Sequence, residues 1–293
     1  MTWIFLTLFA AFMQAWRNAF QSRLSGDVTT AGVTLARFLW ASPIAGVYLI
    51  ALYQWQPAAL PLPTFSSAFW HYVVGASFMQ ILATALMVKL FKYNNYAVGA
   101  GLAKSEALVA AILGMLFFGT QLTVLGWLGV VIGGVGVFML SSHGGFKQLS
   151  LPTVLLGLSS GSAFALTSLW VREASLASQL PFPYSAAWVL LLVISLQTLS
   201  LVGYLLIKER STLYKLWQRP KLVMLTSVSS CLGSIGWFSA MSLQAVPYVK
   251  TLGQVEIFFT MLISIFWLGQ KVRIKDGFGL ILVALAAILV MWT

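Results

Sequence analysis

The chain has 293 residues, of which 60% are hydrophobic and only 8% carry charge. In a soluble domain about half of the residues are apolar and about a quarter are charged, so this composition excludes an ordinary water-soluble domain. The mean hydropathy of +0.91 agrees. On a soluble protein the net charge of +11 would suggest a nucleic-acid partner. In a membrane protein such an excess marks cytoplasmic loops, so we expect a lipid bilayer as partner and no nucleic acid.

Apolar segments follow one another along the whole chain. A membrane-spanning helix needs about 20 mainly apolar residues. Ten such segments can be placed, at Thr2–Gln21, Thr30–Leu52, Ser67–Leu90, Tyr96–Gly119, Val124–Leu140, Thr153–Val171, Tyr184–Ile207, Val223–Leu243, Tyr248–Leu268 and Gly277–Trp292. This pattern predicts an all-α polytopic membrane protein. The longest polar stretch, Lys208–Lys221, is interpreted as a loop at the membrane surface.

Basic residues concentrate in the connections that follow the odd-numbered segments. These connections hold 13 of the 17 Lys and Arg residues, namely Arg17, Arg23, Lys89, Lys92, Lys147, Lys208, Arg210, Lys215, Arg219, Lys221, Lys271, Arg273 and Lys275. The even-numbered connections hold only Arg172. Because cytoplasmic loops are enriched in Lys and Arg, we place the odd-numbered connections in the cytoplasm. Both termini then lie on the opposite side of the inner (plasma) membrane.

The second half of the chain repeats the first. A constant shift of 150 positions lays 96–140 on 246–290 and pairs Leu102 with Leu252, Glu106 with Glu256, Gly119 with Gly269, and Gly129 with Gly279. Each half holds five segments, and an odd number reverses the orientation in which the second copy enters the membrane. We therefore predict two inverted five-helix repeats, at residues 1–142 and 152–293, joined by a linker at 143–151.

Two acidic and three basic residues fall inside apolar segments. Glu106 and Glu256 are candidates for a role in substrate or proton coupling, because an ionisable group inside a bilayer costs several kcal/mol unless it is paired or hydrated. The alternative is that each is a buried structural anchor. Lys104 and Lys250 could hold a substrate carboxylate or neutralise a carboxylate on another helix. Arg37 could face the site, or its side chain could extend to the membrane interface.

Polar side chains recur at helical spacing in three segments. Gln14 and Asn18 give the first segment a polar face that is unusual for a lipid-exposed helix. Gln80 and Ser230 correspond under the repeat and, with Trp237, are predicted to line a cavity. Plain helix packing is the alternative for the tryptophan. The G-x-S-x-G, H-E-x-x-H and P-loop motifs are missing, so we expect no enzyme activity, cofactor or metal.

Glycine motifs occur in the fifth and sixth segments. Gly129-x-x-x-Gly133 and Gly157-x-x-x-Gly161 have the spacing that lets two helix backbones approach closely in a membrane. We interpret both motifs as packing within the chain and therefore expect a monomer rather than a dimer.

This layout resembles the drug/metabolite transporter superfamily, in its EamA-like ten-helix branch, over nearly the whole chain. The acid in the fourth segment of each half carries the likeness, together with Ser242–Glu256, Phe266-Trp267-Leu268-Gly269 and Asp276–Val290. Members of the family often have Glu-Pro in that helix and Gly-Glu at its end, where this chain has Glu256-Ile257 and Gly269-Gln270. The resemblance therefore indicates the superfamily and leaves the substrate open.

The resemblance and the residues imply one class of function. We expect a secondary active transporter that exports a small polar organic metabolite, such as an amino acid, by alternating access. Protons or substrate exchange would drive it. One alternative is an importer or facilitative exchanger of a metabolite or vitamin. An alternative from another class is a non-transporting membrane partner or a lipid-handling protein. The expected partners are the small-molecule substrate, the bilayer and protons.

Overall fold

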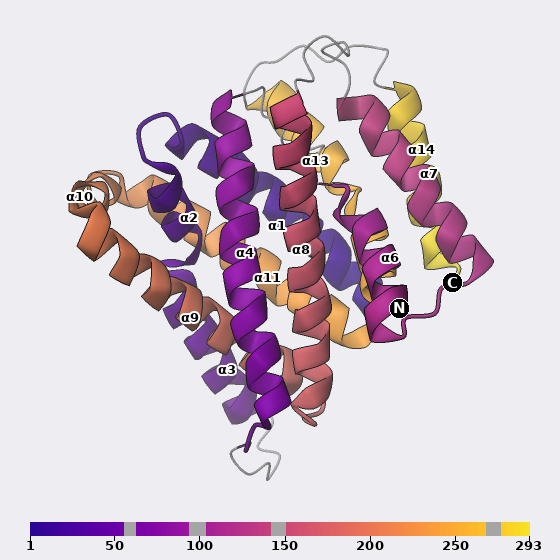
Figure 1. Ribbon diagram of the computed structural model, residues 1–293, viewed down its shortest axis with the longest axis horizontal. Helices are drawn as coiled ribbons and strands as arrows, with labels where there is room; N and C mark the ends of the chain where they lie inside the picture. The colour runs from indigo at the N-terminus through magenta and orange to yellow at the C-terminus, as the bar shows by residue number, and fades with distance from the viewer. Residues whose placement is uncertain (56–62, 94–103, 142–150, 268–276) are drawn as a thin grey trace.

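The computed structural model describes residues 1–55, 63–93, 104–141, 151–267 and 277–293, and within these ranges all regular structure is helical (Figure 1). The helices are α1 (Thr2–Leu24), α2 (Thr30–Phe38), α3 (Ala41–Trp55), α4 (Ser67–Tyr93), α6 (Glu106–Phe118), α7 (Val124–Ser141), α8 (Leu151–Ala177), α9 (Tyr184–Lys208), α10 (Arg210–Trp217), α11 (Pro220–Leu243), α12 (Val246–Gly253), α13 (Glu256–Phe266) and α14 (Gly277–Met291). The prediction of an all-α protein is therefore confirmed for these residues.

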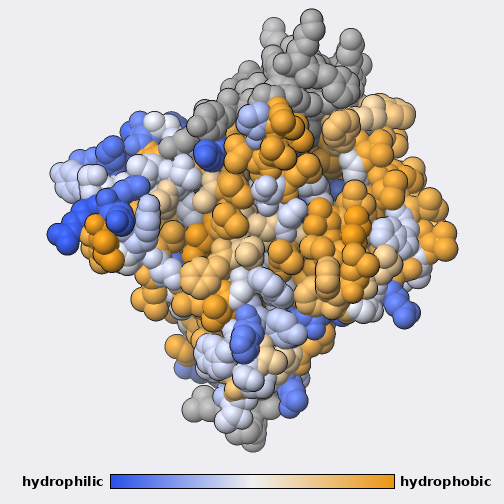
Figure 2. Space-filling model, viewed as in Figure 1, coloured by the Kyte–Doolittle hydropathy of each residue, from blue (hydrophilic) through white to orange (hydrophobic). Residues whose placement is uncertain are grey.

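The helices are long and apolar enough for a membrane protein. Within the described residues, five stretches could cross a bilayer: Thr30–Trp55, Ser67–Phe91, Leu151–Ala177, Tyr184–Lys208 and Pro220–Leu243. Large apolar side chains such as Leu116 and Phe117 are 63% and 73% exposed. Hydrophobic residues cover most of the middle of the face in Figure 2, while hydrophilic ones gather over α10. An apolar surface of this extent requires an apolar environment, so the protein is membrane-embedded.

Three pairs of helices pack along much of their lengths, α1 with α11, α4 with α8, and α7 with α14. The main apolar core lies among α2, α4, α8, α9 and α11, and its largest fully buried side chains include Phe38, Phe69, Leu169 and Leu190. Helices α6 and α12 contact each other beside this core. The polar residues described below lie next to the core, where α1, α4, α8, α11 and α12 meet.

Glycines allow α7 and α14 to approach closely. A Cβ atom added to Gly136 would lie 3.0 Å from the carbonyl oxygen of Gly279, and a Cβ on Gly279 would lie 3.0 Å from the carbonyl oxygen of Gly136. A Cβ on Gly129 would meet Val290 at 2.6 Å. The glycine motif at Gly129 therefore packs two helices of the same chain together, as its spacing predicts.

The helix boundaries differ from the predicted segments in two places. The second segment is divided into α2 and α3 by a turn at Leu39-Trp40. The ninth is divided into α12 and α13 by a turn at Gln254-Val255, where backbone bonds run between residues three apart. A turn at Lys104-Ser105 similarly precedes α6. Leu39 and Trp40 are apolar, so the hydropathy pattern does not reveal the first of these turns, whereas the other two contain the polar residues Lys104 and Gln254.

The polar stretch Lys208–Lys221 is not a loop, because it contains α10. Thr212 and Leu216 of this helix are buried, while Tyr214 and Trp217 are largely exposed. Alternation of buried and exposed side chains at helical spacing is typical of an amphipathic helix at an interface. The predicted linker at 143–151 lies outside the described residues except for its last position, which begins α8.

The contact between α7 and α14 leads to a matched pair of predictions. Gly136→Ala should destabilise the protein by about 1–3 kcal/mol, because its methyl group meets the backbone of α14. Gly134→Ala, two positions earlier, should be neutral or stabilising by up to about 1 kcal/mol, because nothing lies within 4 Å of its added Cβ and alanine favours helix. Thermal unfolding of the purified protein, followed by tryptophan fluorescence, measures both. Equal effects of the two substitutions would contradict this packing.

Candidate functional site

The two acids inside the apolar segments begin two helices. Glu106 is the first residue of α6 and Glu256 is the first residue of α13. Each follows a two-residue turn, Lys104-Ser105 in one case and Gln254-Val255 in the other. A carboxylate in the first turn of a helix is favoured, because the unpaired backbone N–H groups give that end a partial positive charge. The position of each acid at the start of a helix therefore helps to keep it inside the bundle.

Glu256 is fully buried and is held by three side chains. It forms an ion pair with Lys104. Gln14 Nε2 donates a hydrogen bond to its Oε2 atom at 2.5 Å, and Asn18 Nδ2 donates one to its Oε1 atom at 2.8 Å. Gln14 is itself positioned by Trp237, whose Nε1 donates to Gln14 Oε1 at 2.9 Å. Both carboxylate oxygens thus have partners, which is what a buried charge requires.

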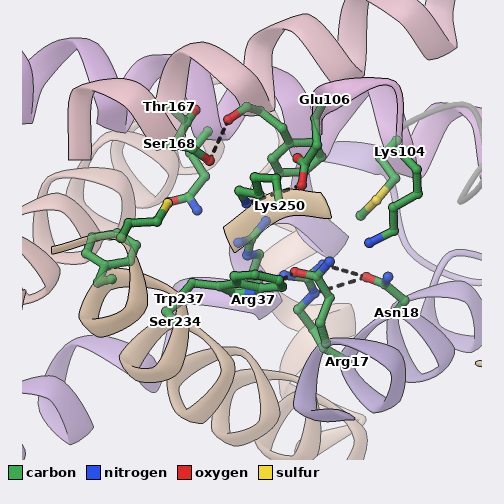
Figure 3. Close-up of a pocket in the computed structure, with 16 residues that line it drawn as sticks. Arg17, Asn18, Arg37, Lys104, Glu106, Thr167, Ser168, Ser234, Trp237 and Lys250 are labelled. Carbon is green, nitrogen blue, oxygen red and sulfur yellow. Dashed lines mark hydrogen bonds and ion pairs between the residues drawn. The ribbon is translucent and has the colours of Figure 1, made fainter. Parts of the chain in front are cut away.

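Glu106 has a simpler environment. Its Oε1 atom lies 3.2 Å from Lys250 Nζ, which is its one partner among the described side chains. The ammonium group of Lys250 also lies 4.4 Å from the ring centroid of Trp237, within the range of a cation–π contact. Glu106 and Lys250 face each other in Figure 3. The two acids that correspond in sequence therefore differ in their surroundings.

Arg37 is buried in the interior, with 2% of its surface exposed. Its Nε donates to Ser230 Oγ at 3.2 Å and its Nη1 donates to Thr84 Oγ1 at 2.6 Å. Its guanidinium carbon lies 5.9 Å from the ring centroid of Phe164. The alternative in which Arg37 extends to the membrane interface is wrong, because hydroxyl groups from two other helices hold its side chain inside the bundle.

A second arginine also lies inside rather than in a connection. Arg17 was predicted to belong to the cytoplasmic connection after the first segment, but it is 2% exposed and lies within α1. Its Nε and Nη2 atoms donate to Asn18 Oδ1 at 3.0 and 2.6 Å. Because α1 extends to Leu24, position 17 lies a full two turns before its end.

These side chains surround a cavity of about 30 Å³, which has room for only one or two water molecules. The cavity is lined by Gln14, Arg17, Asn18, Arg37, Gln80, Met87, Lys104, Glu106, Phe164, Thr167, Ser168, Ser234, Trp237, Phe238, Met241 and Lys250, ten of which are labelled in Figure 3. Two predicted site residues lie behind this lining, since Glu256 and Ser230 reach it only through their partners. Gln80 reaches it directly and accepts a hydrogen bond from Gln197 at 2.7 Å.

Sequence reasoning missed part of the lining. Thr167 and Ser168 of α8 were not predicted, although they correspond to Arg17 and Asn18 under the shift of 150 positions. Applying the same shift to the first segment would have identified them. Ser234, which also lines the cavity, corresponds to Thr84 under this shift. The aromatic and methionine lining carries no sequence signal, because such residues are abundant throughout the chain.

Comparisons with known proteins identify the fold and no function. No protein-family model and no curated protein matches the sequence. A solved structure described only as "Crystal structure of protein" is similar to this chain with a TM-score of 0.68 and 15% identity, over 98% of this chain and 98% of that one. At this identity the likeness concerns the fold alone.

The different surroundings of the two acids predict unequal effects on stability. Glu256→Gln should cost about 3–5 kcal/mol, because it leaves the buried Lys104 without a charge partner. Glu106→Gln should cost less, because Lys250 keeps its contact with Trp237. Thermal unfolding of the two variants in one detergent provides the comparison.

A second pair of variants tests the contact between Lys250 and Glu106. Lys250→Met alone should destabilise the protein more than Lys250→Met combined with Glu106→Gln. The reverse order in either pair would rule out these assignments.

Proposed function

We propose that the protein is a secondary active transporter for a small polar organic metabolite, working by alternating access between two inverted five-helix repeats. One observation carries the proposal: two buried Lys–Glu pairs lie beside a polar cavity inside a membrane-embedded helical protein. Charged groups inside the bilayer are costly and typically mark substrate or proton pathways. The two halves would be residues 1–142 and 152–293, with ten membrane spans in all.

The helix packing supports the repeat. The shift of 150 positions relates α1 to α8 and α4 to α11, so it exchanges the packed pair α1–α11 with the packed pair α8–α4. The turns before the two acids also have nearly the same backbone, with φ −55° and ψ −14° at Ser105 and φ −58° and ψ −16° at Val255. Such agreement is expected for two copies of one fold.

The lining of the cavity supports a site between the repeats. Gln14, Arg17 and Asn18 correspond to Phe164, Thr167 and Ser168 under the same shift, and all six line the cavity. Transporters with inverted repeats bind their substrates near the bilayer midplane, at the interface of the repeats. The present cavity is too small for an organic molecule, so binding requires the two repeats to move apart on one side.

The ion pairs suggest which acid couples transport to protons. Both pairs join the first half of the chain to the second, so relative motion of the halves strains them. Glu106 lines the cavity, whereas Glu256 has three partners behind it. A proton on Glu106 would remove its attraction for Lys250 and release that contact between the halves. We therefore assign the coupling role to Glu106 and a structural role to Glu256.

The orientation in the membrane follows from the positive loops. Both chain ends lie on one side of the molecule in Figure 1, opposite the end of α7 and the start of α8. The basic connection between those two helices contains Lys147, and basic loops face the cytoplasm. The termini would then be on the outer side of the inner membrane.

Cysteine labelling tests whether the cavity opens to water. In a Cys231→Ala background, Gln80→Cys should react with a charged, membrane-impermeant thiol reagent, because the side chain lines the cavity. Phe78→Cys is the matched control on the same helix, since that side chain is 53% exposed on the outer surface and would face lipid. A lipid-handling or non-transporting protein predicts no reaction at position 80. Failure of Gln80→Cys to react from either side would refute transport by alternating access.

Proton movement tests the assignment of Glu106. Wild-type protein is placed in proteoliposomes that contain a pH-sensitive dye. The internal pH should change when a transported metabolite is added. We expect Glu106→Gln to abolish this signal, because glutamine cannot carry the proton. Glu256→Asn combined with Lys104→Met, which removes the other pair, should keep it provided the protein folds. Unchanged proton movement in Glu106→Gln would exclude the coupling role.

A further inference from the structure

We infer that the transported substrate is a small organic anion whose carboxylate or phosphate group binds to Arg37. The inference rests on the proposed transport function and adds the chemical class of the substrate. It starts from the hydrogen-bonding capacity of Arg37. The guanidinium has five N–H donors, and the contacts to Ser230 and Thr84 account for two of them. Three donors remain for a ligand in the cavity that Arg37 lines.

Arg37 forms no ion pair with a carboxylate in the described part of the protein. None of the carboxylates there lies within 4.0 Å of its guanidinium. Its two hydrogen-bond acceptors are uncharged hydroxyl groups. Burying an unpaired charge is strongly unfavourable, and guanidinium matches the geometry of carboxylate and phosphate oxygens. An anionic ligand would therefore supply the negative charge that no carboxylate of the described residues places beside Arg37.

The other charges at the cavity exclude a cationic substrate. Among the described residues, Arg37, Lys104 and Lys250 stand at the cavity or beside it, against the two carboxylates of Glu106 and Glu256. Each carboxylate already pairs with a lysine. An ammonium group of a substrate would find no carboxylate available to it and would meet a net positive field.

The aromatic surface at the cavity leads to the same conclusion. The face of Trp237, which could otherwise attract a substrate cation, is already in contact with the ammonium group of Lys250. The neighbouring hydroxyl of Ser234 lines the cavity and can donate a hydrogen bond to an anion. The donors around Arg37 thus favour negative charge, and nothing in the lining is arranged for a free positive one.

Ligand-induced stabilisation tests this inference on the full-length protein in detergent. The probes are three anions (L-lactate, succinate and glycerol 3-phosphate), two zwitterions (L-alanine and L-glutamine) and one cation (choline), all at constant ionic strength. We expect at least one anion to raise the unfolding temperature and the zwitterions and choline to leave it unchanged, because a ligand stabilises the state that it binds.

Variants of Arg37 distinguish specific binding from a general effect of salt. Arg37→Gln should weaken binding of that anion about tenfold or more, and Arg37→Lys should retain part of it, because lysine keeps the charge but loses the bidentate geometry. The matched control is Arg172→Gln, since Arg172 donates to the carbonyl oxygens of Met241 and Gln244 and does not line the cavity. This control should bind the anion as the wild type does. If Arg37→Gln does not fold, the comparison of Arg37→Lys with wild type decides.

The outcomes separate this inference from the proposed function. One outcome would be that a zwitterion or choline stabilises the protein and is transported in counterflow, while no anion has an effect. That outcome would support the transport function and overturn the anionic substrate. Equal anion binding by wild type and Arg37→Gln would overturn the role of Arg37, and so would the absence of a shift with all three anions. If Gln80→Cys also resists aqueous labelling, the transport function itself fails and this inference fails with it.

Discussion

The structure depends on two ion pairs inside the helical bundle, Lys104–Glu256 and Lys250–Glu106, because their charges must be stabilised away from water. A charge removed from water is tolerated only where partners of good geometry replace its hydration. The polar face of α1 exists where Glu256 needs donors, and both acids stand at helix starts, where the backbone favours negative charge. A turn directly before each acid, at Lys104-Ser105 and at Gln254-Val255, provides those positions.

Much of the fold could be predicted from sequence, because hydropathy and helix length are strong signals in a membrane protein. Segments such as Ser67–Leu90 and Tyr184–Ile207 agree with α4 and α9 to within a few residues. The turn inside the second segment could not be predicted, since Leu39 and Trp40 are as apolar as their neighbours. The polar residues at the turn in the ninth segment, Gln254 and Glu256, also fit the polar face of an unbroken helix. Helix α10 was missed because a polar stretch of this length also fits a surface loop.

The candidate site, too, could be predicted from the sequence only in part. A shared position in two repeats indicated that Glu106 and Glu256 are special, but it implied that they are equivalent. Their partners come from other helices, so only the tertiary structure reveals that one has three partners and the other one. Arg37 illustrates the point further: from sequence, an arginine near a helix end fits the interface as well as the interior. Its burial depends on hydroxyl groups of α4 and α11 that no local pattern connects to it.

The displacement of one lysine has a consequence for the energy of the proposed transport cycle. In the proposed repeat, position 254 corresponds to Lys104 but holds Gln254, whose buried amide atoms have no hydrogen-bond partner among the described residues. The lysine stands instead at position 250, one helical turn earlier. Two identical halves would give inward-facing and outward-facing states of equal free energy. With the lysine displaced, the two states of the proposed cycle would form different contacts, and the resting protein would then have a preferred side. A difference of only about 1.4 kcal/mol would populate one state tenfold over the other.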